Sequence, residues 1–169
     1  MQEVLIRSGV NFYRCFHCRL CHNGCPFAGV MEHPPNHLIR LLQLGRLEEA
    51  LQSNTIWICV GCNACISFCP MAVNIPVLMD TLREMAREKG LPVKEPDVVE
   101  FHRQVLAAIR RRGRANELEI MLGYKLKKRE WLNDLGLGLK MLAKQKIKLW
   151  PTSIRDPQEL EPLFEGCEP

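Results

Sequence analysis

Residues 15–26 read CFHCRLCHNGCP, and residues 59–70 read CVGCNACISFCP. Both stretches have the spacing C-x2-C-x2-C-x3-C-P, and the second begins 44 residues after the first. These two runs hold all but one of the nine cysteines in the 169-residue chain, and only Cys167 stands apart. A closely spaced set of four cysteines ending in Cys-Pro is typical of iron–sulfur ligation, whereas zinc sites usually pair two widely separated C-x2-C knuckles.

The expected cellular compartment agrees with metal binding rather than disulfide formation. Residues 1–15 show no long apolar run and no small-residue cleavage site of a secretory signal. We therefore expect a cytoplasmic, soluble protein in which thiols stay reduced. Residues 56–79 carry no charged side chain, but they contain four cysteines and two prolines, so we interpret them as a buried metal-binding segment rather than a transmembrane helix.

Two [4Fe–4S] clusters are the cofactors that the repeated run predicts. Three cysteines spaced by two residues can surround one cluster, and the longer last spacing carries the fourth cysteine away. In two-cluster ferredoxins this fourth cysteine ligates the other cluster. We therefore expect one cluster on Cys15, Cys18, Cys21 and Cys69, and a second on Cys25, Cys59, Cys62 and Cys65. Structural zinc bound by the same thiolates is the alternative interpretation.

The segments around the two runs have helical periodicity. Apolar residues from Leu38 to Leu44 form one stripe that ends at Gly45, and Leu47–Leu51 suggests a second short helix. Asn74 is expected to cap a helix with Pro76 in its first turn and Gly90 at its end. Further helices are expected at Asp97–Arg112, Asn116–Leu122, Lys127–Leu135 and Leu139–Lys148. Because no run alternates as a strand does, the predicted fold class is all-α.

Charge divides the chain into three expected parts. Residues 1–93, the predicted dicluster domain, have a net charge of +1. Residues 94–150 have a net charge of +7 and form a basic helical extension, and residues 151–169 have a net charge of −4 and form an acidic tail that we expect to dock a partner. The basic stretch from Arg110 to Arg129 could serve as a docking face for an acidic partner or simply be a solvated helix surface.

The motifs limit the chemistry to electron transfer. All eight motif cysteines are expected to serve as ligands, and the sequence has no G-x-G-x-x-G or other phosphate loop and no nucleophile–histidine arrangement, so we expect no catalytic residue. A net charge of only +4 and an aromatic content of 7% argue against nucleic acid. His17 and His22 lie between ligands of the first run, but four cysteines per cluster leave no ligand position for them. We expect Trp57 to be packed in the core.

The two runs, the helical segment between them and the ending GLGLKMLAKQKIKLWP resemble the C-type subunit of heterodisulfide reductase over most of residues 10–150. The resemblance implies an α-helical ferredoxin fold with two [4Fe–4S] clusters. The same module occurs in the iron–sulfur subunits of succinate dehydrogenase, fumarate reductase, glycolate oxidase and anaerobic glycerol-3-phosphate dehydrogenase. This chain has no plant-type ferredoxin domain, no CCG domain and no transmembrane segment beside the module, which favours the small C-type subunit.

The resemblance also implies partners in a hetero-oligomer. Electrons would pass between an A-type subunit with FAD and iron–sulfur clusters and a B-type subunit with CCG domains that reduces a disulfide. The chain would then be one subunit of an oxidoreductase and not catalytic alone. The alternative is the iron–sulfur subunit of another flavin dehydrogenase, and a zinc-binding interaction protein is a more distant one.

Overall fold

The computed structural model describes residues 1–128, 141, 144, 153–154 and 160–164. Every regular element in this part of the chain is helical, which confirms the predicted all-α class. The chain divides into two compact units, residues 1–96 and residues 97–169, which are taken separately below. No helix among the described residues combines the length and the apolar character that crossing a bilayer requires.

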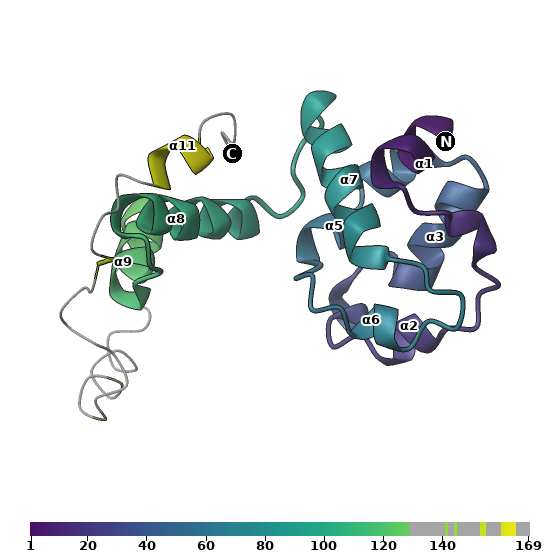
Figure 1. The fold of residues 1–169 in the computed structure, drawn as a ribbon, viewed down its shortest axis with the longest axis horizontal. Coiled ribbons are helices and arrows are strands. Elements are labelled where there is room, and N and C mark those ends of the chain that lie inside the picture. The colour runs from purple at the N-terminus through teal and green to yellow at the C-terminus, as the bar shows by residue number, and fades with distance from the viewer. Residues whose placement is uncertain (129–140, 142–143, 145–152, 155–159, 165–169) are drawn as a thin grey trace. The chain divides into compact units, whose positions relative to one another are not determined.

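The first unit consists of short helices followed by one long helix (Figure 1). In chain order they are α1 (Gln2–Ser8), the 3-10 turn η1 (Phe12–Arg14), α2 (Leu20–Asn23), the 3-10 turn η2 (Ala28–Val30), α3 (Pro35–Gln43), α4 (Leu47–Leu51), α5 (Thr55–Ile58), α6 (Ala64–Ser67) and α7 (Ile75–Glu88). The helices expected between the two cysteine runs correspond to α3 and α4. The short helices α1, α2, α5 and α6 were not expected from periodicity, because four to seven residues are too few to show it.

The core of this unit is built mainly from side chains of α3 and α7 and of the helices that each of them contacts. Helix α7 contacts α1, α4 and α5, and α3 contacts η1, α2 and α4. The side chains that fill the interior include Leu38, Ile39 and Leu42 of α3 and Leu78, Met79, Leu82 and Met85 of α7, each at most 1% exposed. Burying apolar side chains of this size is the main source of stability in a small domain. The first cysteine run precedes α3 and the second precedes α7, so the packing of these helices helps to position both runs.

Helix α7 begins as the sequence predicts. The side chain of Asn74 accepts a hydrogen bond from the backbone N–H of Val77 at 3.3 Å, and Pro76 stands in the first turn. Gly90 follows the helix with a φ of +62°, a left-handed conformation that glycine adopts without steric cost. The Asn74 cap sets the direction in which the chain leaves the second cysteine run.

The second unit contains α8 (Pro96–Arg112), α9 (Glu117–Lys128) and α11 (Glu161–Phe164). Helix α8 was expected. Helix α9 replaces the shorter predicted helix 116–122, and it includes the first two residues of the helix expected at 127–135. Helix α9 continues through Gly123, where a Cβ atom would lie 2.4 Å from the Gln104 side chain of α8. The rest of the helix expected at 127–135, nearly all of 139–148 and most of the acidic tail lie outside the described residues.

Candidate metal centre

The two cysteine runs have the same backbone conformation. His17 and Gly61 occupy equivalent positions with φ of +62° and +64°, and Arg19 and Asn63 occupy the next equivalent pair with φ of +65° and +62°. Positive φ is uncommon outside glycine, so its recurrence at matched positions marks a loop that both runs must form. The one-turn helices α2 and α6 follow at the same offset and lie side by side (Figure 1).

The exposure of the eight thiols repeats in the same way. The first and fourth cysteines of each run are half-buried, the second is exposed and the third is buried. Cys21 and Cys65, the buried pair, are 7% and 8% exposed. The exposed pair, Cys18 and Cys62, therefore mark where a group held by each set would come closest to solvent.

The thiols influence one another across the two runs. Burial raises the pKa of Cys21 to about 12, and the charges of Cys15, Cys65, Cys18 and Cys69 add to the increase. The pKa of Cys15 is also raised, mainly by burial, with Cys69 and Cys18 as the neighbouring charges.

The second run shows the mirror pattern. Burial raises the pKa of Cys65 to about 11, and its charged neighbours are Cys59, Cys62 and Cys25. The pKa of Cys59 is raised by burial, and Cys25 again contributes while Arg83 acts in the opposite direction. The first and third cysteines of each run therefore lie near enough to the fourth cysteine of the other run to be affected by its charge. Because a metal binds the thiolate, loading such a site releases the protons that these raised pKa values retain.

A cavity lies at the second run, and it is lined by Cys25, Cys59, Cys62 and Cys65. The rest of its wall is mostly apolar and includes Met31, Ile75 and Met79. Four thiol donors around a largely apolar cavity are the donor set that a [4Fe–4S] cluster uses. Within the described residues, no three His, Cys, Asp or Glu side chains lie close enough together to hold a single metal ion.

Two side chains from outside the runs hold the backbone of the loops. The Gln43 amide donates from Nε2 to the carbonyl oxygens of Phe12 and Cys15 at 3.1 and 3.0 Å. Arg83 donates to the carbonyl oxygens of Ile56 and Cys59. Sequence reasoning missed both residues, because each lies more than twenty positions from the cysteine it supports and carries no motif of its own.

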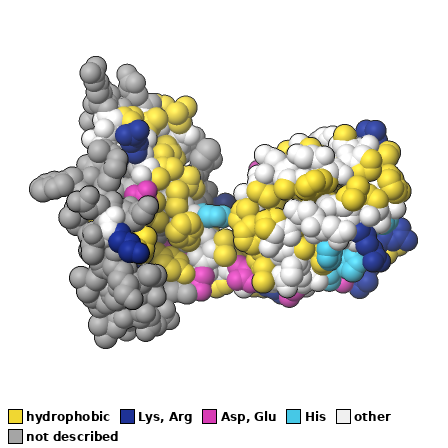
Figure 2. Space-filling view, turned by 90° about the horizontal axis from the view of Figure 1, so that it is seen from below, with side chains coloured by type: hydrophobic (Ala, Val, Ile, Leu, Met, Phe, Trp, Pro, Cys, Tyr) yellow, Lys and Arg dark blue, Asp and Glu magenta, His cyan; other side chains and the backbone are white. Residues whose placement is uncertain are grey.

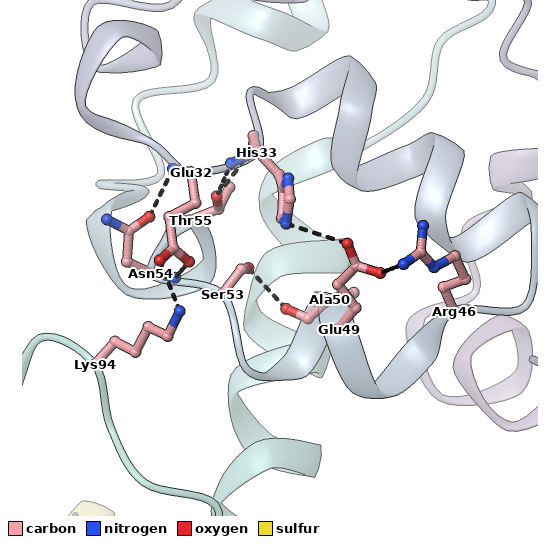
Figure 3. A network of polar contacts seen from close by, with 9 residues as sticks. All are labelled: Glu32, His33, Arg46, Glu49, Ala50, Ser53, Asn54, Thr55 and Lys94. Carbon is pink, nitrogen blue, oxygen red and sulfur yellow. Dashed lines mark hydrogen bonds and ion pairs between the residues drawn. The ribbon is translucent and has the colours of Figure 1, made fainter.

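A polar network ties the chain after the first run to the chain before the second (Figure 3). The carboxylate of Glu32 accepts from Lys94 Nζ at 2.6 Å and from the backbone N–H of Asn54 at 2.9 Å. Thr55 exchanges two hydrogen bonds with the backbone of His33, at 2.9 and 3.0 Å. The pKa of Glu32 is lowered by the hydrogen bond from Lys94, with the Asn54 N–H as a further cause. The network fixes the start of α5 and, through it, the approach to Cys59.

Exposed apolar side chains surround the motifs. Phe16, Leu20, Val60 and Phe68 are 60%, 45%, 57% and 51% exposed, and all four lie within the two cysteine runs. Residues 9–31 contain two arginines and no acidic residue, and residues 56–79 contain no charge. Figure 2 shows hydrophobic side chains over much of the visible face of residues 1–96, with His and Lys or Arg gathered near one end. Such a surface is typical of a site that another protein covers.

The structure also describes three other features considered from the sequence, namely Trp57, His17 and part of the basic stretch. Trp57 is 6% exposed, as expected of a core residue. His17 makes a hydrogen bond through Nε2 to Gln43 Oε1 at 2.7 Å. In the basic stretch, Arg111 and Arg112 both form ion pairs with Glu119, at 2.8 and 2.6 Å, so part of this charge is neutralised within the unit.

Comparison with known proteins agrees with the geometry. Residues 11–73 match the family model of the 4Fe-4S dicluster domain. This range includes all eight motif cysteines and the helices α3 and α4 between the two runs. The cofactors of the chain are therefore two [4Fe–4S] clusters.

Several similar curated proteins carry related names. The chain is 30% identical over 101 residues to the C-type iron-sulfur subunit of the CoB–CoM heterodisulfide reductase of Methanopyrus kandleri, and the match covers 60% of this chain and 50% of that protein. It is 31% identical over 101 residues to the second C-type iron-sulfur subunit of the same reductase in Methanocaldococcus jannaschii, with the same coverage. It is 37% identical over 76 residues to a C-like heterodisulfide reductase protein of Archaeoglobus profundus, covering 44% of this chain and 40% of that one. The matched region spans about half the length of these relatives or less. The chain is thus a 4Fe-4S dicluster electron-transfer protein related to the C-type subunits of heterodisulfide reductases.

Proposed function

We propose that the chain is the electron-relay subunit of a heterodisulfide reductase-like complex. It would pass electrons between an A-type subunit with FAD and iron–sulfur clusters and a B-type subunit with CCG domains that reduces a disulfide. The observation that carries this proposal is the packing of two equivalent cysteine loops against each other, with exposed apolar side chains in both. The related names of the curated relatives indicate the kind of complex.

The proposed ligation is crossed. One cluster would be held by Cys15, Cys18, Cys21 and Cys69, and the other by Cys25, Cys59, Cys62 and Cys65. Support comes from the charges that act on Cys15 and Cys21, which include Cys69, and from the cavity that Cys25 shares with the three cysteines of the second run. When bound, each cluster supplies a one-electron carrier.

The chain's own residues would hold the two carriers close together and control access to them. Buried Cys21 and Cys65, with Met31, Ile75 and Met79 in the cavity wall, would keep water from one side. Exposed Cys18 and Cys62 would leave the other side open to a partner. A partner with an apolar patch and acidic groups around it would suit the apolar surface, Arg19 of the first run and Arg14 just before it.

The test is isolation of the complex from its natural source under anaerobic conditions, through an affinity tag on this chain. We expect a flavin-containing A-type subunit and a CCG-domain B-type subunit to co-purify, and we expect the dithionite-reduced complex to be reoxidised by a heterodisulfide. Recovery of a succinate- or glycolate-type flavin subunit instead would contradict the proposal.

A matched pair of variants tests the role of the apolar surface. Phe16→Asp places a charge on this surface, and we expect it to weaken the association. Ile6→Asp places the same charge on α1, where Ile6 is 75% exposed, and we expect the complex to stay intact. Equal effects of both variants would show that the apolar surface around the motifs is not where the partner binds.

A further inference from the structure

The two cysteine loops are equivalent in backbone but not in the side chain that supports them. The carbonyl oxygens of Phe12 and Cys15 in the first loop correspond, at the 44-residue offset, to those of Ile56 and Cys59 in the second. In the first loop both oxygens accept from Gln43, at the end of α3. In the second loop both accept from Arg83, in α7. The same two positions are therefore held by a neutral amide in one loop and by a guanidinium in the other.

The cation beside the second loop is partly shielded from water. The Arg83 side chain is 22% exposed, and its other contact is Asp80 Oδ1 at 2.5 Å. The Asp80 side chain is 63% exposed, so solvent screens its charge more than that of Arg83.

The first loop keeps a neutral support. Both hydrogen bonds that Gln43 donates come from its amide nitrogen, and its oxygen faces His17 Nε2 at 2.7 Å. Arg40 also approaches this oxygen, at 3.3 Å, but it is an exposed side chain and contacts the amide oxygen, whereas the Cys15 carbonyl contacts the amide nitrogen.

We propose that Arg83 is a redox-tuning residue, whose positive charge raises the reduction potential of the cluster held by Cys59, Cys62 and Cys65 and makes the two clusters inequivalent. Reduction adds one negative charge to a cluster, and a nearby cation in a partly desolvated position stabilises the reduced form. Assignment of the effect to one cluster rests on the proposed ligation. The difference gives an electron a preferred resting place within the relay.

The test is a potentiometric titration of the iron-loaded full-length protein, followed by EPR of the reduced clusters. In Arg83→Met, which has similar length and no charge, we expect one of the two titration steps to move to lower potential. The ratio of reduced to oxidised cluster at a fixed potential should fall by up to about tenfold, equivalent to about 59 mV for a one-electron couple. Arg83→Lys keeps the charge and should restore most of the ratio. Lys89→Met removes a cation just after the same helix, where Lys89 pairs with Glu48, and should change neither step.

A second variant identifies which step belongs to which loop. Gln43→Lys introduces a cation at the equivalent support of the first loop, so it should raise the step that Arg83→Met leaves unchanged. The proposal is overturned if Arg83→Met moves neither step, if Arg83→Lys moves it equally, or if both loops' variants move the same step.

Asp80→Asn provides a test that leaves the backbone contacts of Arg83 in place. If Arg83→Met does not bind iron, the tuning role is judged on Asp80→Asn, which removes the opposing anion. In this variant, the reduction potential of the step that Arg83→Lys preserves should rise. An unchanged potential would overturn the proposal. If the variants bind full iron but their reduction potentials do not shift, the tuning proposal is overturned and the proposed relay function is not affected. If the wild-type chain binds no iron, both the tuning proposal and the relay function are overturned.

Discussion

Gly24 and Phe68 lie against each other across the two cysteine runs, each one residue before the fourth cysteine of its run. A Cβ atom on Gly24 would come within 2.4 Å of the Phe68 ring atom Cδ2. The two residues occupy equivalent positions at the 44-residue offset, so the larger side chain of one run fills the space that the smaller residue of the other leaves. This contact sets how closely α2 and α6 approach.

Gly24→Ala is therefore expected to push the Phe68 ring outward and loosen the two runs. Because Phe68 is 51% exposed and its ring can shift, the cost should lie near the lower end of the roughly 1–3 kcal/mol of core overpacking, and thermal denaturation of the iron-loaded protein measures it. Gly29→Ala is the matched control, because nothing lies within 4 Å of a Cβ atom there. The double variant Gly24→Ala/Phe68→Ala should recover most of the loss, and additive losses would show that the two residues do not act on each other.

Crossed ligation can be tested by pairing serine substitutions. Cys69→Ser alone should damage one cluster. Adding Cys15→Ser should cause little further loss of iron, because both residues belong to the same proposed cluster, whereas adding Cys59→Ser should remove iron from both. Iron and acid-labile sulfide analysis measures the outcome, and the opposite pattern of the two double variants would show that each run binds its own cluster.

Glu32 makes a pH-dependent contribution to stability. Its pKa lies below the ordinary value of 4.5 because Lys94 and the Asn54 N–H stabilise the carboxylate. The contribution is therefore fully present above pH 4.5 and is lost as the pH falls through the lower folded-state pKa. Glu32→Gln should lower the thermal midpoint at neutral pH by a small amount, corresponding to about 1 kcal/mol or less for a partly exposed ion pair.

The pH profile of the Glu32 variant separates this effect from simple loss of packing. The difference in thermal midpoint between wild type and Glu32→Gln should stay constant from about pH 8 to pH 6 and shrink below pH 4.5. A difference that persists unchanged in acid would mean that the charge of Glu32 is not what stabilises the network.

Asn74 should contribute through its cap on α7. Asn74→Ala removes the acceptor for the Val77 N–H and should cost about 1 kcal/mol, while Asn74→Asp keeps an acceptor and should cost little. Chemical denaturation of the iron-loaded protein measures both variants. Equal losses in the two would contradict a capping role.

The features that the sequence predicts correctly depend on residues that are close together in the chain. Asn74, Pro76 and Gly90 mark the ends of α7, and the periodic leucines from Leu38 mark α3, because capping and amphipathic spacing act over a few residues. The cysteine spacing predicts the cofactors for the same reason. Helix α9 continues through Gly123, and the absence of a side chain there leaves room for Gln104 of α8, which local propensity does not predict.

The supports of the site follow from tertiary packing and could not be predicted in this way. Gln43 and Arg83 are ordinary polar residues of amphipathic helices, and only the fold brings them to the carbonyl oxygens of Cys15 and Cys59. The Gly24–Phe68 contact likewise depends on how α2 meets α6. The internal 44-residue offset relates Gly24 to Phe68, but it does not relate Gln43 to Arg83, which are 40 residues apart.

The most direct test of the account is anaerobic analysis of iron and sulfide together with EPR of the dithionite-reduced chain. Two [4Fe–4S] clusters predict about eight irons and eight sulfides per chain, and their closeness predicts a spin-coupled signal from two interacting S = 1/2 centres. A colourless protein with about two zinc ions and no sulfide would contradict the electron-relay account and leave a structural zinc protein.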